Sequence, residues 1–308
     1  MLQNMLTVGE QVLILFILIA MGYTCGKTKL INSTVSSGLT NIVMYFVMPC
    51  VIINAYQRSY DPTMLKGLLL AFLAAFLCHF VSILLSRLLL HDPDKRRESV
   101  YRFAIVFSNA GFMALPLQQA VLGDVGVFYG ATYITVYNLL ALSYGIYTMS
   151  RDRKVLSFRG LMLNPAILSV IVGLIFFFTS FKLPHVIAAP IQYVAALNTP
   201  LPMMLIGFYL SNAKLGKVLR DKKSYWTMLL RLVISPLISL GLIMLLGIRG
   251  DVMVASLISA SAPAAAFTSM FAEKYNCDID LSVGLVSFTT LLSIITMPVI
   301  IGFVQTLG

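Results

Sequence analysis

Apolar runs of about 20 residues, the length that a helix needs to cross a bilayer, recur along the whole chain. Short polar or charged segments separate them. This pattern predicts ten transmembrane helices, at residues 6–25, 34–56, 64–87, 100–121, 125–149, 161–180, 185–210, 225–246, 251–272 and 281–304.

Two of the predicted spans contain residues that interrupt a helix. The fourth reads Ser-Asn-Ala-Gly-Phe-Met-Ala-Leu-Pro up to Pro116, and the ninth reads Ser-Ala-Ser-Ala-Pro-Ala-Ala-Ala-Phe around Pro263. Proline has no N–H and clashes with the carbonyl four residues earlier. We therefore expect helix breaks at Pro116 and Pro263. The alternative is a pair of ordinary proline kinks in packed helices.

The positions of the prolines also predict an internal repeat. Pro116 and Pro263 lie almost half a chain apart, and so do Pro49 and Pro200. A short basic segment, 151–160, divides the chain into residues 1–150 and 161–308, each with five predicted spans. An odd number of spans reverses the orientation of the second half, so a duplication here would be an inverted repeat. Coincidence is the alternative, because prolines are common in membrane helices.

Composition supports the membrane assignment. Hydrophobic residues make up 59% of the chain and charged residues 11%, whereas about 25% charged residues is usual in soluble domains. The mean hydropathy is +0.90. Residues 1–10 contain no Lys or Arg, so the first apolar run lacks the basic start of a signal peptide and is predicted to be retained.

The net charge of +10 is distributed unevenly between alternate loops. Only Arg58, Lys66, Lys182 and Arg249 are assigned to one side, and the other 18 Lys and Arg residues, Arg231 among them, are assigned to the other. The positive-inside rule then makes the basic side cytoplasmic and places both termini outside, as expected for a protein of the plasma (inner) membrane. The charge is interpreted as a topology signal that contacts membrane lipid, and no nucleic acid partner is expected.

Acidic residues restrict the possible mechanisms. All twelve are assigned to loops or span ends, so no intramembrane carboxylate is expected to relay protons or ions. The scattered cysteines suggest neither a disulfide framework nor a metal site, no cofactor is expected, and no hydrolase motif is present, so the chain is not predicted to be an enzyme. His79 is either a neutral packed side chain or a proton-linked group. Glu273 and Lys274, at the end of the ninth span, are the candidates for a gate.

The breaks suggest a binding site for an anion. Each break creates a half-helix N-terminus, whose partial positive charge favours an anionic group. Neutral polar or conformationally permissive residues lie at or near the breaks and on the fifth span. The candidate substrate-binding residues are Asn109, Gly111, Pro116, Tyr137, Asn138, Ser259, Ser261 and Pro263. Helix-to-helix hydrogen bonding is the alternative role for each polar residue outside the breaks.

These motifs resemble the auxin efflux carrier superfamily, which includes plant PIN-type carriers and bacterial malonate- and malate-type permeases. The resemblance covers nearly the whole chain and is carried by motifs in a fixed order. They are Ser108-Asn109-Ala110-Gly111-Phe112 with Leu115-Pro116, Asn164-Pro165, Pro202 with Ile206-Gly207, and Ala262-Pro263 with Ala272-Glu273-Lys274-Tyr275.

The resemblance implies an all-α membrane protein of ten helices, arranged as two inverted five-helix repeats with broken, crossing helices 4 and 9. It also implies a mobile transport domain, a homodimer, and a substrate carboxylate bound by Asn109, with Tyr137 and Asn138 nearby. The long cytoplasmic loop of many plant members is absent, because only residues 150–160 stand in its place. We expect a secondary transporter for a small organic anion. A non-transporting membrane receptor or sensor with the same fold is the alternative.

Overall fold

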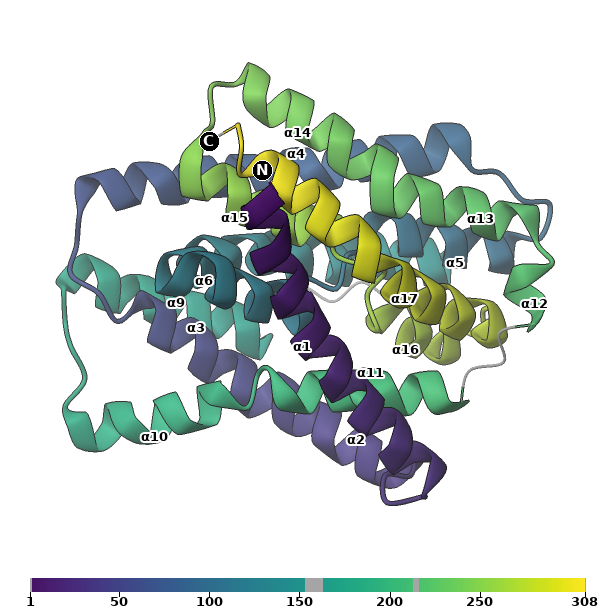
Figure 1. The fold of residues 1–308 in the computed structure, drawn as a ribbon, viewed down its shortest axis with the longest axis horizontal. Helices are drawn as coiled ribbons and strands as arrows, with labels where there is room; N and C mark the ends of the chain where they lie inside the picture. Colours follow the sequence, from purple (N-terminus) through teal and green to yellow (C-terminus); the bar gives the residue numbers. More distant parts are fainter. Residues whose placement is uncertain (1, 153–162, 213–215, 308) are drawn as a thin grey trace.

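The computed structural model describes residues 2–152, 163–212 and 216–307, and the secondary structure of this part of the chain is helical apart from one isolated β-bridge (Figure 1). Seven helical segments are long and apolar enough to cross a membrane. They are Gly9–Lys27, Ser33–Tyr56, Pro62–Leu89, Ala110–Ser150, His185–Asn212, Lys222–Leu245 and Ile279–Val304. The chain is therefore an all-helical membrane protein, and the count of ten crossings stays a prediction.

Each half contains ten helical elements among the described residues. The first half contains α1 (Leu2–Lys27), α2 (Ser33–Ile42), η1 (Val43–Val47), α3 (Met48–Tyr56), α4 (Pro62–Leu89), α5 (Lys95–Val106), η2 (Ala110–Ala114), α6 (Leu115–Leu140), η3 (Ala141–Gly145) and α7 (Ile146–Ser150) when the short π-helical turns, written η, are included. The second half contains α9 (Pro165–Thr179), α10 (His185–Ala196), α11 (Pro200–Asn212), α12 (Gly216–Leu219), α13 (Lys222–Leu229), η5 (Leu230–Ile234), α14 (Ser235–Leu245), α15 (Gly250–Ser261), α16 (Phe267–Lys274) and α17 (Ile279–Val304). The predicted basic segment 151–160 lies largely outside the described residues.

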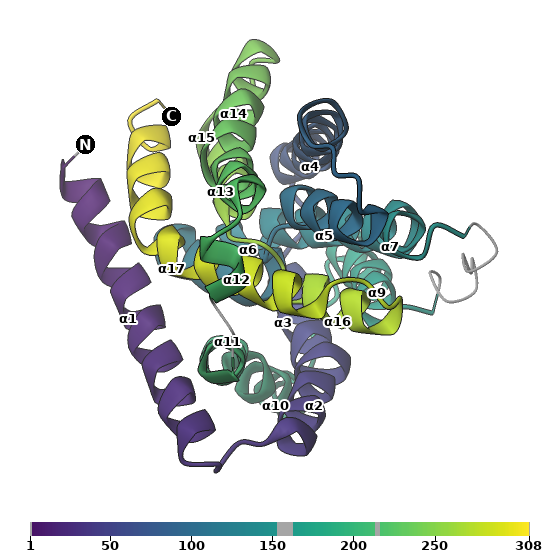
Figure 2. The same cartoon turned by 90° about the vertical axis from the view of Figure 1, so that its right-hand side faces the viewer.

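Helices α1, α2, α10 and α11 lie together on one side of the molecule (Figure 2). Helix α1 packs along α11, and the two backbones approach closely where Gly22 faces Met204 and Gly207 faces Ile19. A Cβ atom on either glycine would collide with the backbone of the other helix. Small residues allow this close packing in membranes, where helices gain little from hydrophobic burial against each other. On the other side, α4, α14 and α15 pack together, and α5 contacts α13 and α17.

Three π-helical turns each come just before a proline. η1 precedes Pro49, η2 precedes Pro116, and η5 precedes Pro236, and each proline is among the first two residues of the next α-helix. A π turn bonds each N–H to the carbonyl five residues earlier, which widens the helix where a proline ring would clash. The chain can therefore continue as a helix through all three prolines.

One sharp kink lies between the predicted fourth and fifth spans. Gly123 has φ 64° and ψ −151°, so α6 consists of two helical parts with different directions. Only glycine adopts this conformation at little cost. The kink falls in the gap that the hydrophobic pattern predicted between residues 121 and 125.

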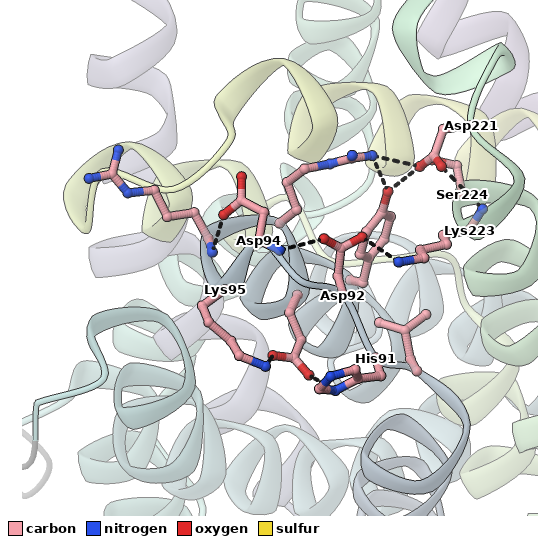
Figure 3. Close-up of polar contacts among 12 residues, drawn as sticks. His91, Asp92, Asp94, Lys95, Asp221, Lys223 and Ser224 are labelled. Atoms are coloured by element: carbon pink, nitrogen blue, oxygen red, sulfur yellow. Dashed lines mark hydrogen bonds and ion pairs between the residues drawn. The ribbon is translucent and has the colours of Figure 1, made fainter.

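A polar cluster joins the turn before α5 to the start of α13 (Figure 3). Lys223 binds the buried carboxylate of Asp92 at 2.8 Å, and Arg97 binds Asp221 at 3.0 Å. Ser224 donates to the same Asp221 carboxylate at 2.9 Å. Burial opposes ionisation of Asp92, but its hydrogen bond from Lys223 lowers the pKa of this carboxyl below its ordinary value. The cluster fixes α5 against the helix that continues into η5.

Candidate substrate-binding site at the helix breaks

The two interrupted helices meet at their breaks. Helix α5 ends at Val106 and α15 ends at Ser261, and the extended segments that follow run antiparallel with a bridge between Ser108 and Ala264. The Asn109 N–H donates to the Pro263 carbonyl at 2.7 Å, and the Ala265 N–H donates to the Phe107 carbonyl at 2.9 Å. Each break thus satisfies part of the backbone of the other, as buried non-helical backbone at membrane depth requires.

The second break lies where its proline predicted it. Ala262, which precedes Pro263, has φ −60° and ψ 150°, the extended conformation imposed on a residue before proline. The prediction that Pro116 breaks the first helix was wrong. The break lies at Phe107–Asn109, and Pro116 is inside a helix that begins at Ala110, because the π turn η2 accommodates its ring.

A buried arginine connects the ends of both broken helices. Arg231, in η5, is 1% exposed, and its guanidinium donates to three backbone carbonyls. Its Nη1 binds the Ile105 carbonyl at 2.9 Å, its Nε binds the Ala262 carbonyl at 3.1 Å, and its Nη2 binds the Ala260 carbonyl. The last carbonyls of a helix lack partners within it, and a cation is favourable beside them. Arg231 supplies both needs for α5 and α15 together.

The assignment of Arg231 to a basic loop was therefore wrong, because its side chain is buried between the ends of the two broken helices. Among the described residues, no carboxylate forms an ion pair with Arg231. The signal was present in the sequence, because Arg231 stands alone in the apolar run 225–246. An ionisable residue inside a membrane span is by default a functional candidate.

A cavity of about 80 Å³ lies against the first break. It is bounded by η1, the start of η2, α6 and the start of α9, with Phe267 of α16 closing one wall. Its lining residues are Met44, Tyr45, Met48, Ser108, Asn109, Ala110, Gly111, Phe112, Ile134, Tyr137, Asn138, Asn164, Pro165, Ala166 and Phe267. The mixture of apolar walls and a few polar groups is typical of a small-molecule site.

Three buried polar atoms of this lining have no hydrogen-bond partner in the described part of the chain. They are the Ser108 hydroxyl, the Asn109 Nδ2 and the Tyr137 hydroxyl. Buried polar groups are nearly always paired, and an unpaired one needs an explanation. A polar ligand in the cavity would provide the missing partners.

The electrostatics of the cavity favour an anion. The helix that begins at Ala110 has its N-terminus at the cavity, where its first backbone amides lack partners within the helix. Arg231 lies close to this wall, because its Nη1 donates to the carbonyl of Ile105, three residues before Ser108. The positive end of the helix dipole and the positive charge of Arg231 therefore both act on the cavity.

Of the eight predicted site residues, four line this cavity: Asn109, Gly111, Tyr137 and Asn138. The Asn138 amide donates to the Ile134 carbonyl of its own helix at 2.9 Å, so one of its two N–H donors is already engaged. The amide of Asn109 is not.

The other four predicted residues lie outside the cavity lining. Pro116 lines a different cavity, and Pro263 contributes its carbonyl to the bond with Asn109. The Ser259 hydroxyl accepts from Gln118 Nε2 at 2.9 Å, and the Ser261 hydroxyl donates to the Ile258 carbonyl of its own helix at 3.2 Å. These two serines therefore contribute to helix packing in this structure.

His79 and Glu273 also have defined surroundings. The His79 Nδ1 lies 2.8 Å from the Ala75 carbonyl, and its ring centroid is 4.8 Å from that of Tyr133. Its Nε2 has no partner among the described residues, so both readings of His79 stay open. Glu273 and Lys274 line a larger cavity of about 550 Å³ between α2, α11, α16 and α17.

Interrupted helices that meet beside a small cavity are characteristic of membrane transporters, and comparison with known proteins points to the same class. Residues 7–301 match the membrane transport protein family. An uncharacterized transporter of Methanocaldococcus jannaschii is 27% identical over 304 residues, which cover 94% of this chain and 96% of the relative. Auxin efflux carrier component 6 of Arabidopsis thaliana is 29% identical over 154 residues, 49% of this chain and 26% of the plant protein. The chain therefore belongs to the membrane transport protein family of auxin efflux carriers, which is a family of transporters and not of catalytic enzymes.

Proposed function

We propose that the protein is a secondary transporter that carries a small organic anion, a mono- or dicarboxylate, bound at the first helix break. The observation that carries this proposal is the set of three unpartnered buried polar groups, Ser108, Asn109 and Tyr137, on a cavity at a helix N-terminus. The Asn109 amide donates to the carboxylate, and the backbone amides after Ala110 add further donors. A hydrogen bond to a charged group contributes about 1.5–3 kcal/mol.

Arg231 balances the charge of the bound carboxylate. Its guanidinium is held by carbonyls of both broken helices, so it cannot rotate away to meet another partner. A buried cation without a carboxylate partner is costly, and an anion in the neighbouring cavity reduces that cost. Arg231 moves across with the loaded site and moves back with the empty site, so its own charge makes no net contribution. Each transport cycle therefore transfers only the charge of the anion. An imposed potential of 100 mV then biases monovalent flux by about 2.3 kcal/mol.

The size of the cavity favours a compact ligand. A buried water needs about 10–15 Å³ of such space, so the 80 Å³ beside Asn109 holds a group of only a few heavy atoms. The apolar walls formed by Met48, Ile134 and Phe267 suit a short carbon chain next to the carboxylate.

Two further cavities support an alternating-access, elevator-like mechanism. The cavity containing Glu273 and Lys274 lies between α2, α11 and the second broken helix, and another of about 230 Å³ lies between α3, α10 and the start of α6. Each cavity therefore has two walls. One wall belongs to the group formed by α1, α2, α10 and α11, together with α3, which continues from α2. The other wall is a segment that follows a break. We propose that these cavities are the two access routes and that the segments containing the breaks move against this group.

The same proposal includes two inverted five-helix repeats, with both termini outside the plasma (inner) membrane, and a homodimer. The paired breaks support the repeat. So does the correspondence between Pro49 in the first half, which follows a π turn, and Pro200 in the second half, which begins α11. Single cysteines at positions 155 and 306 in a cysteine-free background should be labelled only from the cytoplasm and only from outside, respectively. Labelling of both from one side would contradict the inverted arrangement.

The substrate proposal is tested by uptake into proteoliposomes. We expect labelled malonate, malate or another small carboxylate to accumulate, and the same compound to raise the thermal stability of the purified protein by selective binding to its folded state. The matching amides, which keep the shape but lack the charge, serve as controls. Stabilisation by a carboxylate without uptake would indicate a receptor, whereas equal response to acids and amides would contradict an anion site.

A further inference from the structure

A second polar cavity, the basic pocket, has a volume of about 400 Å³ and shares no lining residue with the cavity at the breaks. It lies between the end of α4, the first turns of α5, and η3 with α7. Its lining residues are Arg87, His91, Lys95, Glu98, Ser99, Arg102, Tyr144, Tyr147, Thr148 and Arg151. The proposed transport mechanism makes no use of this pocket.

The lining of the basic pocket has an excess of positive charge. Four permanent cations, Arg87, Lys95, Arg102 and Arg151, are accompanied by one carboxylate, Glu98. Lys95 binds Glu98 at 2.8 Å and Arg102 binds it at 2.7 Å, and the ring of His91 points to the same carboxylate (Figure 3). Burial opposes ionisation of Glu98, but its hydrogen bond from Lys95 and the charge of Arg102 lower its pKa below the ordinary value. Glu98 is therefore ionised, and the lining keeps three uncompensated positive charges.

Two of the guanidinium groups, those of Arg87 and Arg151, are held in place by neutral partners. Arg87 donates to the Tyr144 hydroxyl at 3.3 Å and lies over that ring. Arg151 donates to the Ser99 hydroxyl at 3.3 and 3.4 Å. The Arg102 Nε is buried and has no partner in the described part of the chain. These contacts orient the guanidinium groups without using all of their N–H donors, of which each arginine has five.

The basic pocket lies at the expected level of the lipid headgroups. Arg87 is in the last turn of α4, and the Trp226 indole donates to the carbonyl of Leu89, the last residue of that helix, at 3.1 Å. Partly exposed tryptophans mark the boundary between lipid and water. Basic pockets between membrane helices on the cytoplasmic side are suited to anionic headgroups.

We propose that the basic pocket binds a phosphate group through Arg87, Arg102 and Arg151. Arginine matches phosphate because its planar fork donates two parallel hydrogen bonds. The position of the pocket makes the headgroup of an anionic phospholipid its ligand, and free phosphate in the cytoplasm offers the same chemistry from solution. Binding here would stabilise the contact between α5 and α7 independently of substrate.

The test is lipid binding to the purified full-length protein, measured by native mass spectrometry with phosphatidylglycerol against phosphatidylcholine. We expect preferential retention of phosphatidylglycerol by the wild type. Arg102→Gln combined with Arg151→Gln should weaken its binding about tenfold or more. Thr148→Glu, which removes no arginine and adds a negative charge to the pocket, should do the same. Lys222→Gln removes an exposed cation from the same side outside the pocket and should leave binding unchanged.

The outcomes separate the two sources of phosphate. Loss of phosphatidylglycerol in the pocket variants, with no competition from millimolar inorganic phosphate, supports a lipid headgroup. Loss in the same variants together with competition by inorganic phosphate supports a soluble phosphate ligand. Equal retention of phosphatidylglycerol by the wild type and both pocket variants would overturn the proposal. None of these readouts depends on transport activity.

Discussion

The two helix breaks lie side by side and bond to each other, yet they differ in chemistry. The first contains Ser108 and Asn109, whose side chains have unpartnered polar atoms beside a cavity. The second consists of alanines around Pro263, and its Ala264 N–H is already bound by the Thr289 hydroxyl at 3.1 Å. One break is thus equipped to bind a ligand and the other is saturated. Two breaks with similar backbone geometry therefore need not contribute equally to a substrate-binding site.

Arg231 is the one side chain that bonds to the ends of both broken helices in the described structure, so its replacement should have the largest effect. Arg231→Leu leaves three buried carbonyls without donors, and each unpaired group costs about 1–3 kcal/mol. We expect loss of folded protein, measured by size-exclusion chromatography and thermal unfolding. Arg231→Lys keeps the charge but not the fork, and should give folded protein of lower stability with residual transport.

The matched control is Arg249→Leu. Arg249 also donates to backbone carbonyls, of Met244 and Ile248, but it is exposed at the surface. Its loss should change stability little. If Arg231→Leu is as stable as Arg249→Leu, the guanidinium does not hold the breaks together.

The next largest effect is expected at the first break. Asn109→Ala removes an amide donor of the proposed site and should weaken carboxylate binding by about 1.5–3 kcal/mol, roughly 10- to 150-fold. Asn109→Asp, which is nearly isosteric, should be worse because its charge repels the anion. Both should keep the thermal stability of the wild type within a few degrees. Unchanged affinity of Asn109→Ala would exclude this residue from the site.

At the second break, Thr289→Val should affect stability and not affinity. The substitution keeps the shape of the side chain and removes the acceptor of the buried Ala264 N–H, at a cost of about 1–3 kcal/mol. Thermal unfolding and substrate titration, run on the same preparation, separate the two effects. A large loss of affinity with normal stability would show that the second break also contacts substrate.

The smallest effect is expected for Ser261→Ala, which tests the asymmetry directly. The Ser261 hydroxyl donates within its own helix and lies outside the cavity lining. Carboxylate affinity should therefore remain within about twofold of the wild type. A reduction comparable with that of Asn109→Ala would mean that both breaks bind the ligand.

The hydrophobic pattern predicted an all-helical membrane protein correctly, because lipid exposure leaves a simple signal, long apolar runs. Pro263 and Gly123 were also informative, since their backbone requirements are local. Pro116 was misleading, because a π turn absorbs a proline without ending the helix, and a π turn has no clear sequence signature. The first break at Ser108 and Asn109 follows from long-range pairing with the second, which the order of residues does not reveal.

The candidate site was predictable only in part, for a related reason. Asn109, Tyr137 and Asn138 were found from the motif and its resemblance to a family, and they share a cavity. Helix α15 is buried on all sides, so its polarity pattern gives no indication of which face Ser259 and Ser261 occupy. Arg231 was assigned to a basic loop because the charge count divided all Lys and Arg residues between two sides of the membrane. That count takes no account of how deep a residue lies within an apolar run.

The bond between Arg231 and the Ile105 carbonyl joins residues 126 positions apart in the chain. A ribosome adding roughly 5–20 residues per second takes about 6–25 s to synthesise that interval. During this time α5 has been made, but the Ile105 carbonyl lacks the donor that it has in the folded protein. The first half therefore cannot complete this hydrogen-bond network until η5 has been synthesised. Biosynthesis of the carrier is in this sense a single event for both halves, and neither half completes its own interior.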